Sequence, residues 1–321
     1  MIGKYAVRVR NSRNEYSFEL KRNITVLCGD SGRGKTTLFE MISEYNRFGK
    51  SSGVSVSCDR RIVALGGDNW ESEIERCSGC IIVIDEDSEF IRSYDFARAV
   101  RGSDNYFLLI TRNYLSGLPY SVDEIYELTG RKNKKFSSVY SGVYRMFDRP
   151  VRSKLPFVPE VILTEDERAG YQFYKRVAEK AGIICISATG KSNIYNLLKE
   201  YRNKDVVVVA DGAAFGADIR TIVEQQKLSP NKIAIFLPES FEWLILKSGA
   251  VDVDPDNIDN PENYADSCEY MSWEQYFTDL LIQSTQDKAY GRYKKESLPD
   301  YYTQTSVTEM IISEIPGLKL K

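Results

Sequence analysis

Eight consecutive residues near the N-terminus have the types and spacing of a phosphate-binding loop. They match the pattern GxxxxGK[ST] and read Gly29, Asp30, Ser31, Gly32, Arg33, Gly34, Lys35 and Thr36, with Thr37 directly after them. Glycines let successive backbone N–H groups turn inward around phosphates, and Lys35 neutralises the β- and γ-oxygens. Thr36 is expected to place its hydroxyl on Mg²⁺. We therefore expect this segment to bind a purine nucleoside triphosphate, with ATP as the default, together with Mg²⁺.

A second segment supplies the carboxylates that a triphosphate site requires. The apolar run 81–84 is typical of a buried strand, and Asp85 and Glu86 follow it in a Walker B-like pattern. Asp85 is expected to hold the Mg²⁺ shell and Glu86 to polarise an attacking water, which favours hydrolysis over transfer. The alternative is an ordinary strand that ends in an acidic turn. Thr111, at the end of the apolar run 106–110, is a candidate sensor of the γ-phosphate.

Three acidic residues in the second half fall at or just beyond the ends of expected strands. They are Glu165 after 160–164, Asp211 after 206–210 and Glu242 beyond 233–237. Open α/β sheets bind ligands at this edge, so these carboxylates are candidates to bind one or two Mg²⁺ ions. The alternative is that they serve only as turn and helix-cap residues.

Segments of the second half resemble the TOPRIM domain, the metal-dependent fold of topoisomerases, primases and OLD-family nucleases. They are the strand ending in a catalytic glutamate at 161–165, the glycine-containing turn at 190–193 and the DxD strand at 208–213. In addition, 242–244 is similar to a glutamate-aromatic-leucine element of OLD-like versions. The sequence departs from the pattern at Ala213, which stands for the second aspartate of DxD, and at Asp166, where a glycine is usual. Asp218 is a candidate to compensate.

The first half resembles the P-loop NTPase domain of ABC- and OLD-like ATPases, and the pair of domains resembles OLD-family and related phage-defence proteins. This resemblance implies phosphodiester cleavage by Mg²⁺ held at Glu165, Asp211 and Glu242, gated by ATP, with Lys35, Glu86, Glu165 and Asp211 as catalytic residues. An ATP-dependent switch or assembly protein with a catalytically inactive second domain is the competing hypothesis. A small-molecule or nucleotide kinase is a third.

The elements that would position these residues alternate between strands and helices in both halves. Apolar runs at 24–28, 80–84 and 106–110 predict buried parallel strands in the first half, and runs at 160–164, 183–187, 206–210 and 233–237 predict strands in the second. We therefore predict an α/β protein with two α/β domains. The expected divisions are a P-loop NTPase domain at 1–149, a proline-rich linker at 150–159, a TOPRIM-like Rossmannoid domain at 160–250, and an acidic loop with a helical extension at 251–321.

Composition restricts the chemistry and the partners. The 321 residues include no histidine, which excludes every His-based catalytic scheme. The net charge of −3 is not that of a strongly basic nucleic-acid binder, although DNA or RNA remains a candidate partner through a local basic groove. The run 131–136 is one candidate groove, with a solvated loop as the alternative. Because no run reaches about 18 apolar residues, we expect a cytoplasmic protein without a membrane partner. We also expect a homo-oligomer.

Overall fold

The computed structural model describes residues 1–29, 32–113, 115–131, 138–145 and 157–315. These residues form an α/β protein with parallel strands flanked by helices, which confirms the predicted fold class. The chain divides into two compact units. Unit 1 comprises Met1–Asp148 and Asn260–Ser272, and unit 2 comprises Arg149–Asp259 and Trp273–Lys321. Most of the linker expected at 150–159 lies outside the described residues.

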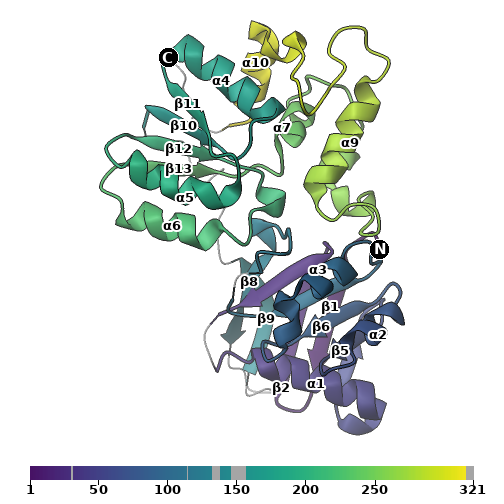
Figure 1. Ribbon diagram of the computed structural model, residues 1–321. Coiled ribbons are helices and arrows are strands. Elements are labelled where there is room, and N and C mark those ends of the chain that lie inside the picture. Colours follow the sequence, from purple (N-terminus) through teal and green to yellow (C-terminus); the bar gives the residue numbers. More distant parts are fainter. Residues whose placement is uncertain (30–31, 114, 132–137, 146–156, 316–321) are drawn as a thin grey trace. The chain divides into compact units, whose positions relative to one another are not determined.

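Unit 1 is built on one sheet, whose described strands follow the order β4-β1-β2-β9-β8-β3-β7-β6-β5 (Figure 1). They are β1 (Tyr5–Arg10), β2 (Asn14–Leu20), β3 (Ile24–Cys28), β4 (Ser55–Ser57), β5 (Ile62–Leu65), β6 (Ile81–Ile84), β7 (Tyr106–Ile110), β8 (Ile125–Arg131) and β9 (Ser138–Arg145). The strands from β8 to β5 are parallel, whereas β1 is antiparallel to both β2 and β4. β3, β6 and β7 are the predicted apolar runs, and every residue in them is buried, as in parallel strands covered on both faces.

Three described α-helices accompany this sheet, namely α1 (Lys35–Phe48), α2 (Trp70–Glu75) and α3 (Tyr94–Val100). α1 buries Leu38, Met41 and Ile42, whose spacing places them on one helical face. It contacts β5, at one end of the strand order, and also β1 and β4, at the other end. The sheet therefore curves around α1, and one core joins α1 to the inner faces of β1 and β2.

A short segment from the second half of the sequence, 260–272, belongs to unit 1. The N-terminal ammonium of Met1 donates hydrogen bonds to Asp266 Oδ1 at 2.7 Å and to Ser267 Oγ at 2.8 Å. The amide of Asn23 donates to the carbonyl of Met271 at 2.7 Å. The sequence-based division places 251–321 in one extension. It does not assign 260–272 to the first domain, because no local sequence pattern marks this segment.

Unit 2 contains a second, four-stranded parallel sheet in the order β11-β10-β12-β13. Its strands are β10 (Val161–Thr164), β11 (Ile184–Ser187), β12 (Val206–Val209) and β13 (Ile233–Phe236), and each matches a predicted strand to within one residue at either end. The chain first moves from β10 to β11 and then crosses back to β12 on the other side of β10. The strand order therefore reverses between β10 and β12, which is where open α/β sheets bind ligands.

Helices cover both faces of this sheet (Figure 1). α4 (Ala169–Ala181) covers one face, and α5 (Lys191–Glu200) and α6 (Ile219–Leu228) cover the other. α4 buries Phe173, Tyr174, Val177 and Ala178, as its helical periodicity predicts, and it ends at Gly182 in the left-handed conformation. The carboxyl ends of β10 and β12, which are neighbouring parallel strands, thus lie side by side at one edge of the sheet.

Four further helices follow the sheet: α7 (Phe241–Lys247), α8 (Asp256–Asp259), α9 (Trp273–Thr285) and α10 (Thr305–Ser313). α9 and α10 both contact α7. α7 begins at a Ser240 cap, whose hydroxyl accepts from the backbone N–H of Trp243 at 3.1 Å. Within the described residues, none of the helices combines the length and apolarity needed to cross a bilayer. The cysteines are free thiols.

Candidate functional site

The candidate phosphate loop leaves the carboxyl end of β3 and enters α1. Gly29, Gly32 and Gly34 have φ angles of 110°, 77° and 91°, a left-handed backbone that residues with a Cβ rarely adopt. Successive N–H groups in such a backbone can face a common anion. Asp30 and Ser31 lie outside the described residues. The three glycines therefore occupy positions at which the left-handed backbone favours glycine.

Lys35 is the first residue of α1, and its side chain folds back over this loop. It is 5% exposed, and its ammonium donates a hydrogen bond of 2.6 Å to the carbonyl of Gly29. Arg33 and Thr36 are exposed, and Thr37 is half-buried. A buried ammonium beside the N-terminus of a 14-residue helix favours a polyanion. The described part of the loop therefore fits the phosphates of a nucleotide.

Two residues that the sequence analysis did not identify support this loop. The Tyr16 hydroxyl, on β2, donates to the carbonyl of Gly34 at 2.8 Å. Glu127, on β8, lies against Gly29, where an added Cβ would be 3.6 Å from its Cγ. No motif marks either residue, because both reach the loop from strands remote in the sequence.

Asp85 and Glu86 lie at the carboxyl end of β6, on the same edge of the sheet as the phosphate loop. Asp85 is 5% exposed, and its Oδ1 accepts from the backbone N–H of Glu86 at 2.9 Å. Burial raises the pKa of the Asp85 carboxyl, and nearby Asp87 raises it further. A cation bound beside Asp85 offsets this cost. The residue therefore fits the metal-holding role that the sequence predicts.

The end of β7 contributes Thr111 and Arg112, and β7 lies between β3 and β6 in the sheet. Thr111 is fully buried, and its hydroxyl accepts from the backbone N–H of Asn113 at 3.0 Å. The Arg112 guanidinium donates two hydrogen bonds of 3.0 Å to the two carboxylate oxygens of Glu86. The predicted sensor strand and the predicted base are thus joined by an ion pair that the sequence analysis did not foresee.

A cavity of about 540 Å³ opens beside Asp85. Phe39 of α1, Gly66 to Asp68 after β5, and Trp70 of α2 contribute to its lining. Trp70 stacks on Phe90 with ring centroids 4.9 Å apart and planes within 6°. The cavity is large enough for part of a nucleotide, and Asp85 on its wall lies at the same edge of the sheet as the phosphate loop.

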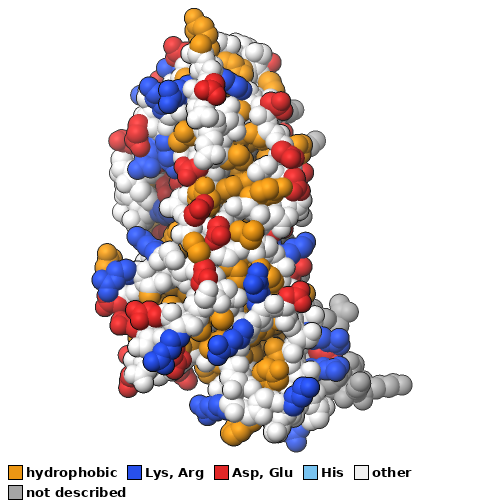
Figure 2. Space-filling view, turned by 90° about the vertical axis from the view of Figure 1, so that its right-hand side faces the viewer, with side chains coloured by type: hydrophobic (Ala, Val, Ile, Leu, Met, Phe, Trp, Pro, Cys, Tyr) orange, Lys and Arg blue, Asp and Glu red, His pale blue; other side chains and the backbone are white. Residues whose placement is uncertain are grey.

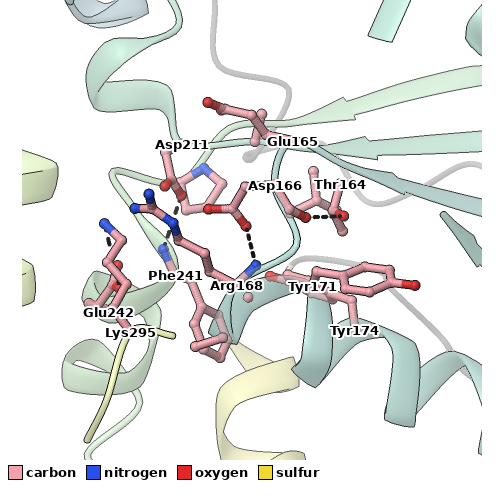
Figure 3. Close-up of a pocket in the computed structure, with 15 residues that line it drawn as sticks. Thr164, Glu165, Asp166, Arg168, Tyr171, Tyr174, Asp211, Phe241, Glu242 and Lys295 are labelled. Atoms are coloured by element: carbon pink, nitrogen blue, oxygen red, sulfur yellow. Dashed lines mark hydrogen bonds and ion pairs between the residues drawn. The ribbon is translucent and has the colours of Figure 1, made fainter. Parts of the chain in front are cut away.

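The second candidate site lies at the carboxyl ends of β10 and β12 in unit 2 (Figure 3). Glu165 follows β10 and Asp211 follows β12, and these strands are direct neighbours. Glu242, the second residue of α7, is 2% exposed. In Figure 3 Asp211 lies between Glu165 on one side and Glu242 with Lys295 on the other. The structure therefore brings the three predicted carboxylates to one pocket, which they all line.

The sequence analysis did not identify two further residues of this site: Lys295 lines the pocket, and Tyr293 contacts Glu242. The Tyr293 hydroxyl donates to Glu242 Oε1 at 2.6 Å. The Lys295 ammonium lies 4.0 Å from the same oxygen and donates to Glu274 Oε1 at 2.7 Å. These residues come from the segment between α9 and α10, whose Tyr- and Lys-rich sequence carries no motif.

Two carboxylates of this pocket, Asp211 and Glu165, have raised pKa values. Burial raises the pKa of Asp211 well above its ordinary value, and the neighbouring Glu274, Glu165 and Glu242 raise it further. Burial also raises the pKa of Glu165 to about 7, against the opposing effect of Lys191. The Lys191 ammonium lies 3.8 Å from Glu165 Oε1. Carboxyls that hold protons near neutral pH are suited to acid–base work.

The pocket fits a cation only in part. Its free volume is about 30 Å³, enough for an ion or a water molecule and too small for a sugar. Glu165 Oε2 and Glu242 Oε2 are buried without a hydrogen-bond partner among the described residues, as expected of oxygens that bind a ligand. However, no group of three or more carboxylates or thiols in the described part of the chain is arranged to hold a metal ion.

Two residues, Ala213 and Asp218, limit how well the pocket fits a cation. Ala213 is buried and cannot supply the second aspartate, and its backbone N–H donates to the carbonyl of Glu239 at 3.1 Å. Asp218, the candidate to compensate, is the N-cap residue of α6. The charged group that acts on its pKa is Lys191, which lowers it against the larger effect of burial. The site is therefore a group of three carboxylates, Glu165, Asp211 and Glu242, with Lys191 and Lys295 nearby.

Charge is mixed over the surface. On the face that Figure 2 shows, Lys and Arg side chains are interspersed with Asp and Glu rather than gathered into one basic surface. Of the basic run at 131–136, residues 132–136 lie outside the described residues. On this face, a surface for nucleic acid would therefore be a local set of basic residues.

Comparison with known proteins assigns no family. No protein-family model matches the chain, and no curated protein matches it. The two sites themselves therefore carry the functional argument.

Proposed function

We propose that the chain binds ATP with Mg²⁺ at Gly29–Thr36 and hydrolyses it. The left-handed glycines and the buried Lys35 support the phosphate-binding role. Asp85, buried at the neighbouring strand end, holds the cation, and Glu86 orients and polarises the attacking water once Arg112 releases it. Mg²⁺ held there would neutralise charge that develops on the phosphate oxygens. Thr111 fixes the loop that follows β7 against the γ-phosphate.

We further propose that unit 2 hydrolyses phosphodiester bonds of a nucleic acid. The observation that carries this proposal is the placement of Glu165 and Asp211 at adjacent strand ends, at the reversal of strand order, with Lys295 beside Glu242. Glu165, with a pKa of about 7, takes a proton from the attacking water. Asp211 and Glu242 would hold a divalent cation, which would supply Lewis-acid polarisation of the phosphoryl oxygen. Lys295 adds positive charge near the same oxygens.

Ala213 favours the competing function, a nucleotide-dependent switch whose unit 2 is catalytically inactive. A missing second aspartate weakens cation binding, and no group of three or more described carboxylates or thiols is arranged to hold a metal ion. In that protein the lysines would replace the cation permanently, and unit 2 would bind a partner without chemistry. The two functions differ in whether unit 2 cleaves a substrate.

A cleavage assay separates these functions. Purified protein is incubated with supercoiled plasmid, single-stranded DNA and RNA, with Mg²⁺ or Mn²⁺, and with or without ATP. We expect cleavage by the wild-type chain and by Glu200→Gln, which removes an exposed carboxylate at the end of α5, and no cleavage by Asp211→Asn. Intact ATPase activity without cleavage under any condition would instead identify the switch. Lys35→Ala is expected to lose nucleotide binding about 10- to 100-fold in both cases, because it removes charge-assisted contacts to phosphate.

A further inference from the structure

The segment between α9 and α10, residues 286–299 and named here the C-terminal strap, has an inner and an outer face. Tyr293 is buried and Lys295 is half-buried, and both contact Glu242 in the carboxylate pocket. Arg292 and Lys294, which alternate with them, are exposed. Alternate residues of an extended segment point to opposite sides. The strap therefore turns one set of side chains toward the carboxylates and another toward solvent.

Hydrogen bonds hold the strap in this position. The Thr285 hydroxyl accepts from the backbone N–H of Tyr293 at 3.0 Å, and the Tyr302 hydroxyl donates to the carbonyl of Gly291 at 2.8 Å. The backbone N–H of Ala169, at the start of α4, donates to the carbonyl of Lys295 at 2.9 Å. Because both ends of this stretch are fixed, its outer side chains are held close to the pocket.

The outer face forms a shallow groove of about 600 Å³ with a basic lining. Its charged residues are Lys288, Arg292, Lys294 and the single acid Asp287. None of the three cations forms an ion pair with a carboxylate of the described residues, in contrast to Lys295, which pairs with Glu242 and Glu274. Unpaired cations that share a groove provide contacts for successive phosphates.

An aromatic side chain stands beside this groove. Tyr290 is 88% exposed, the highest exposure among the large hydrophobic residues described. A ring left in water next to unpaired cations matches the pattern by which proteins bind single-stranded nucleic acids, in which bases stack on aromatics and the backbone follows positive charge. The other large apolar side chains of the strap, Tyr293 and Leu298, are buried, so the described lining of the groove offers no large apolar anchor for a protein partner.

We propose that the C-terminal strap binds single-stranded nucleic acid, with Lys288, Arg292 and Lys294 on its phosphates and Tyr290 stacked on a base. This inference rests on the phosphodiesterase proposed above and names the class of its substrate. Lys294 on the outer face directly precedes Lys295 on the inner face, so the same peptide that holds a phosphate outside also presents an ammonium to Glu242. Nucleic acid bound to the strap is thereby led to the carboxylate pocket.

Binding measured without catalysis tests this inference. Fluorescence anisotropy follows labelled single-stranded DNA and RNA of about 20 nucleotides, a length that covers one or two typical binding sites, in EDTA and without ATP. The variant K288Q/R292Q/K294Q is compared with K180Q/R202Q/K227Q, which removes three exposed cations elsewhere in unit 2. We expect the strap variant to lose affinity about tenfold or more and the slope of log affinity against log salt to fall by about 2, from three contacts on a single strand. The control variant keeps both.

A second variant tests the base contact. Tyr290→Ser is expected to weaken single-strand binding about tenfold without changing the salt slope, because stacking carries no charge. Equal affinity for DNA and RNA would show that the strap contacts phosphates and base faces. A preference for RNA would show an additional contact to the 2′-hydroxyl within the same site. Equal losses in the strap and control variants, tighter binding of duplex than of single strand, or no binding by the wild-type chain at low salt would each overturn the proposal.

The same samples separate this inference from the proposed activity. Asp211→Asn is expected to bind the oligonucleotide like the wild-type chain. If the strap variant loses binding while the wild-type chain cleaves nothing, the strap surface stands and the phosphodiesterase fails. If the wild-type chain cleaves and the strap variant binds and cleaves equally well, the phosphodiesterase stands and the strap surface fails.

Discussion

Arg112 donates from Nε and Nη2 to the two carboxylate oxygens of Glu86, each at 3.0 Å. The pair bridges the ends of β7 and β6, which flank the proposed nucleotide site on one edge of the sheet. A carboxylate engaged by both oxygens is a poor acceptor for the proton of an attacking water. The side chains of Arg112 and Glu86 are 47% and 24% exposed, so the pair contributes little to stability and can open.

We expect Arg112→Ala to raise basal ATP hydrolysis about two- to fivefold. An exposed pair is worth at most about 1 kcal/mol, which corresponds to no more than about a fivefold gain in freed carboxylate. Glu86→Gln is expected to abolish hydrolysis in both backgrounds while ATP still binds. Steady-state phosphate release and binding of a fluorescent ATP analogue measure these two properties. Lower hydrolysis in Arg112→Ala with normal binding would show that Arg112 assists the reaction instead of restraining Glu86.

The pKa of Glu165 makes the stability of unit 2 depend on pH. Burial raises this pKa to about 7 from the ordinary 4.5. The folded state therefore holds the proton more tightly than the unfolded chain, and the resulting stabilisation is complete below pH 4.5 and lost as the pH rises through 7. The free energy of unfolding is expected to fall by up to about 3 kcal/mol across this window. Asp211, whose pKa is also raised by burial, contributes in the same direction.

Urea unfolding at a series of pH values measures this dependence. In a Trp70→Phe background the remaining tryptophans, Trp243 and Trp273, both report on unit 2. Glu165→Gln is expected to flatten the pH profile, and Glu200→Gln on α5 is expected to leave it unchanged. If Glu165→Gln and wild type lose stability in parallel between pH 4.5 and 7, the carboxyl does not titrate in this window.

The parallel strands could be predicted because their sequences are uniform. β3, β6, β7 and β12 are short runs of apolar residues buried on both faces. β1 and β2 were not predicted, although Tyr5, Val7 and Val9 alternate with outward residues as in a sheet covered on one face. Their partner is α1, and no feature of β1 alone indicates that the sheet curves around that helix.

The site was predictable where it follows strand ends and unpredictable where tertiary contacts build it. Glu165 and Asp211 were identified because parallel strands end at a common edge. Lys295 and Tyr293 were not, since their segment has no periodicity and takes its position from hydrogen bonds to Thr285 and α4. Likewise, the sequence placed Glu86 directly after Asp85, the proposed metal ligand, but could not show that Arg112 pairs with Glu86.

Gly212 is required by close packing next to Asp211. A Cβ at this position would lie 2.7 Å from the carbonyl oxygen of Leu237 and 2.8 Å from that of Pro238, both of them backbone atoms. Gly212→Ala is therefore expected to destabilise unit 2 by about 1–3 kcal/mol and to displace Asp211. Thermal unfolding measures the loss. Gly117→Ala serves as the control, because its nearest neighbour, Ala97 Cβ, lies at an ordinary 3.6 Å. Equal melting temperatures for the two variants would contradict the close contact.

The buried hydrogen bond between Tyr293 and Glu242 is expected to stabilise unit 2 directly. Burial, and then the Glu242 carboxylate, raise the pKa of Tyr293 well above its ordinary value, so the hydroxyl remains a donor. Tyr293→Phe removes the hydrogen-bond donor to Glu242 Oε1. Glu242 is 2% exposed, and the Lys295 ammonium, 4.0 Å from the same oxygen, then remains as its nearby cation. The expected loss is about 1–3 kcal/mol in the free energy of unfolding, whereas exposed Tyr290→Phe changes nothing. In a double-mutant cycle, Glu242→Gln with Tyr293→Phe should cost less than the sum of the single changes, and strict additivity would mean that the hydrogen bond contributes no coupling energy.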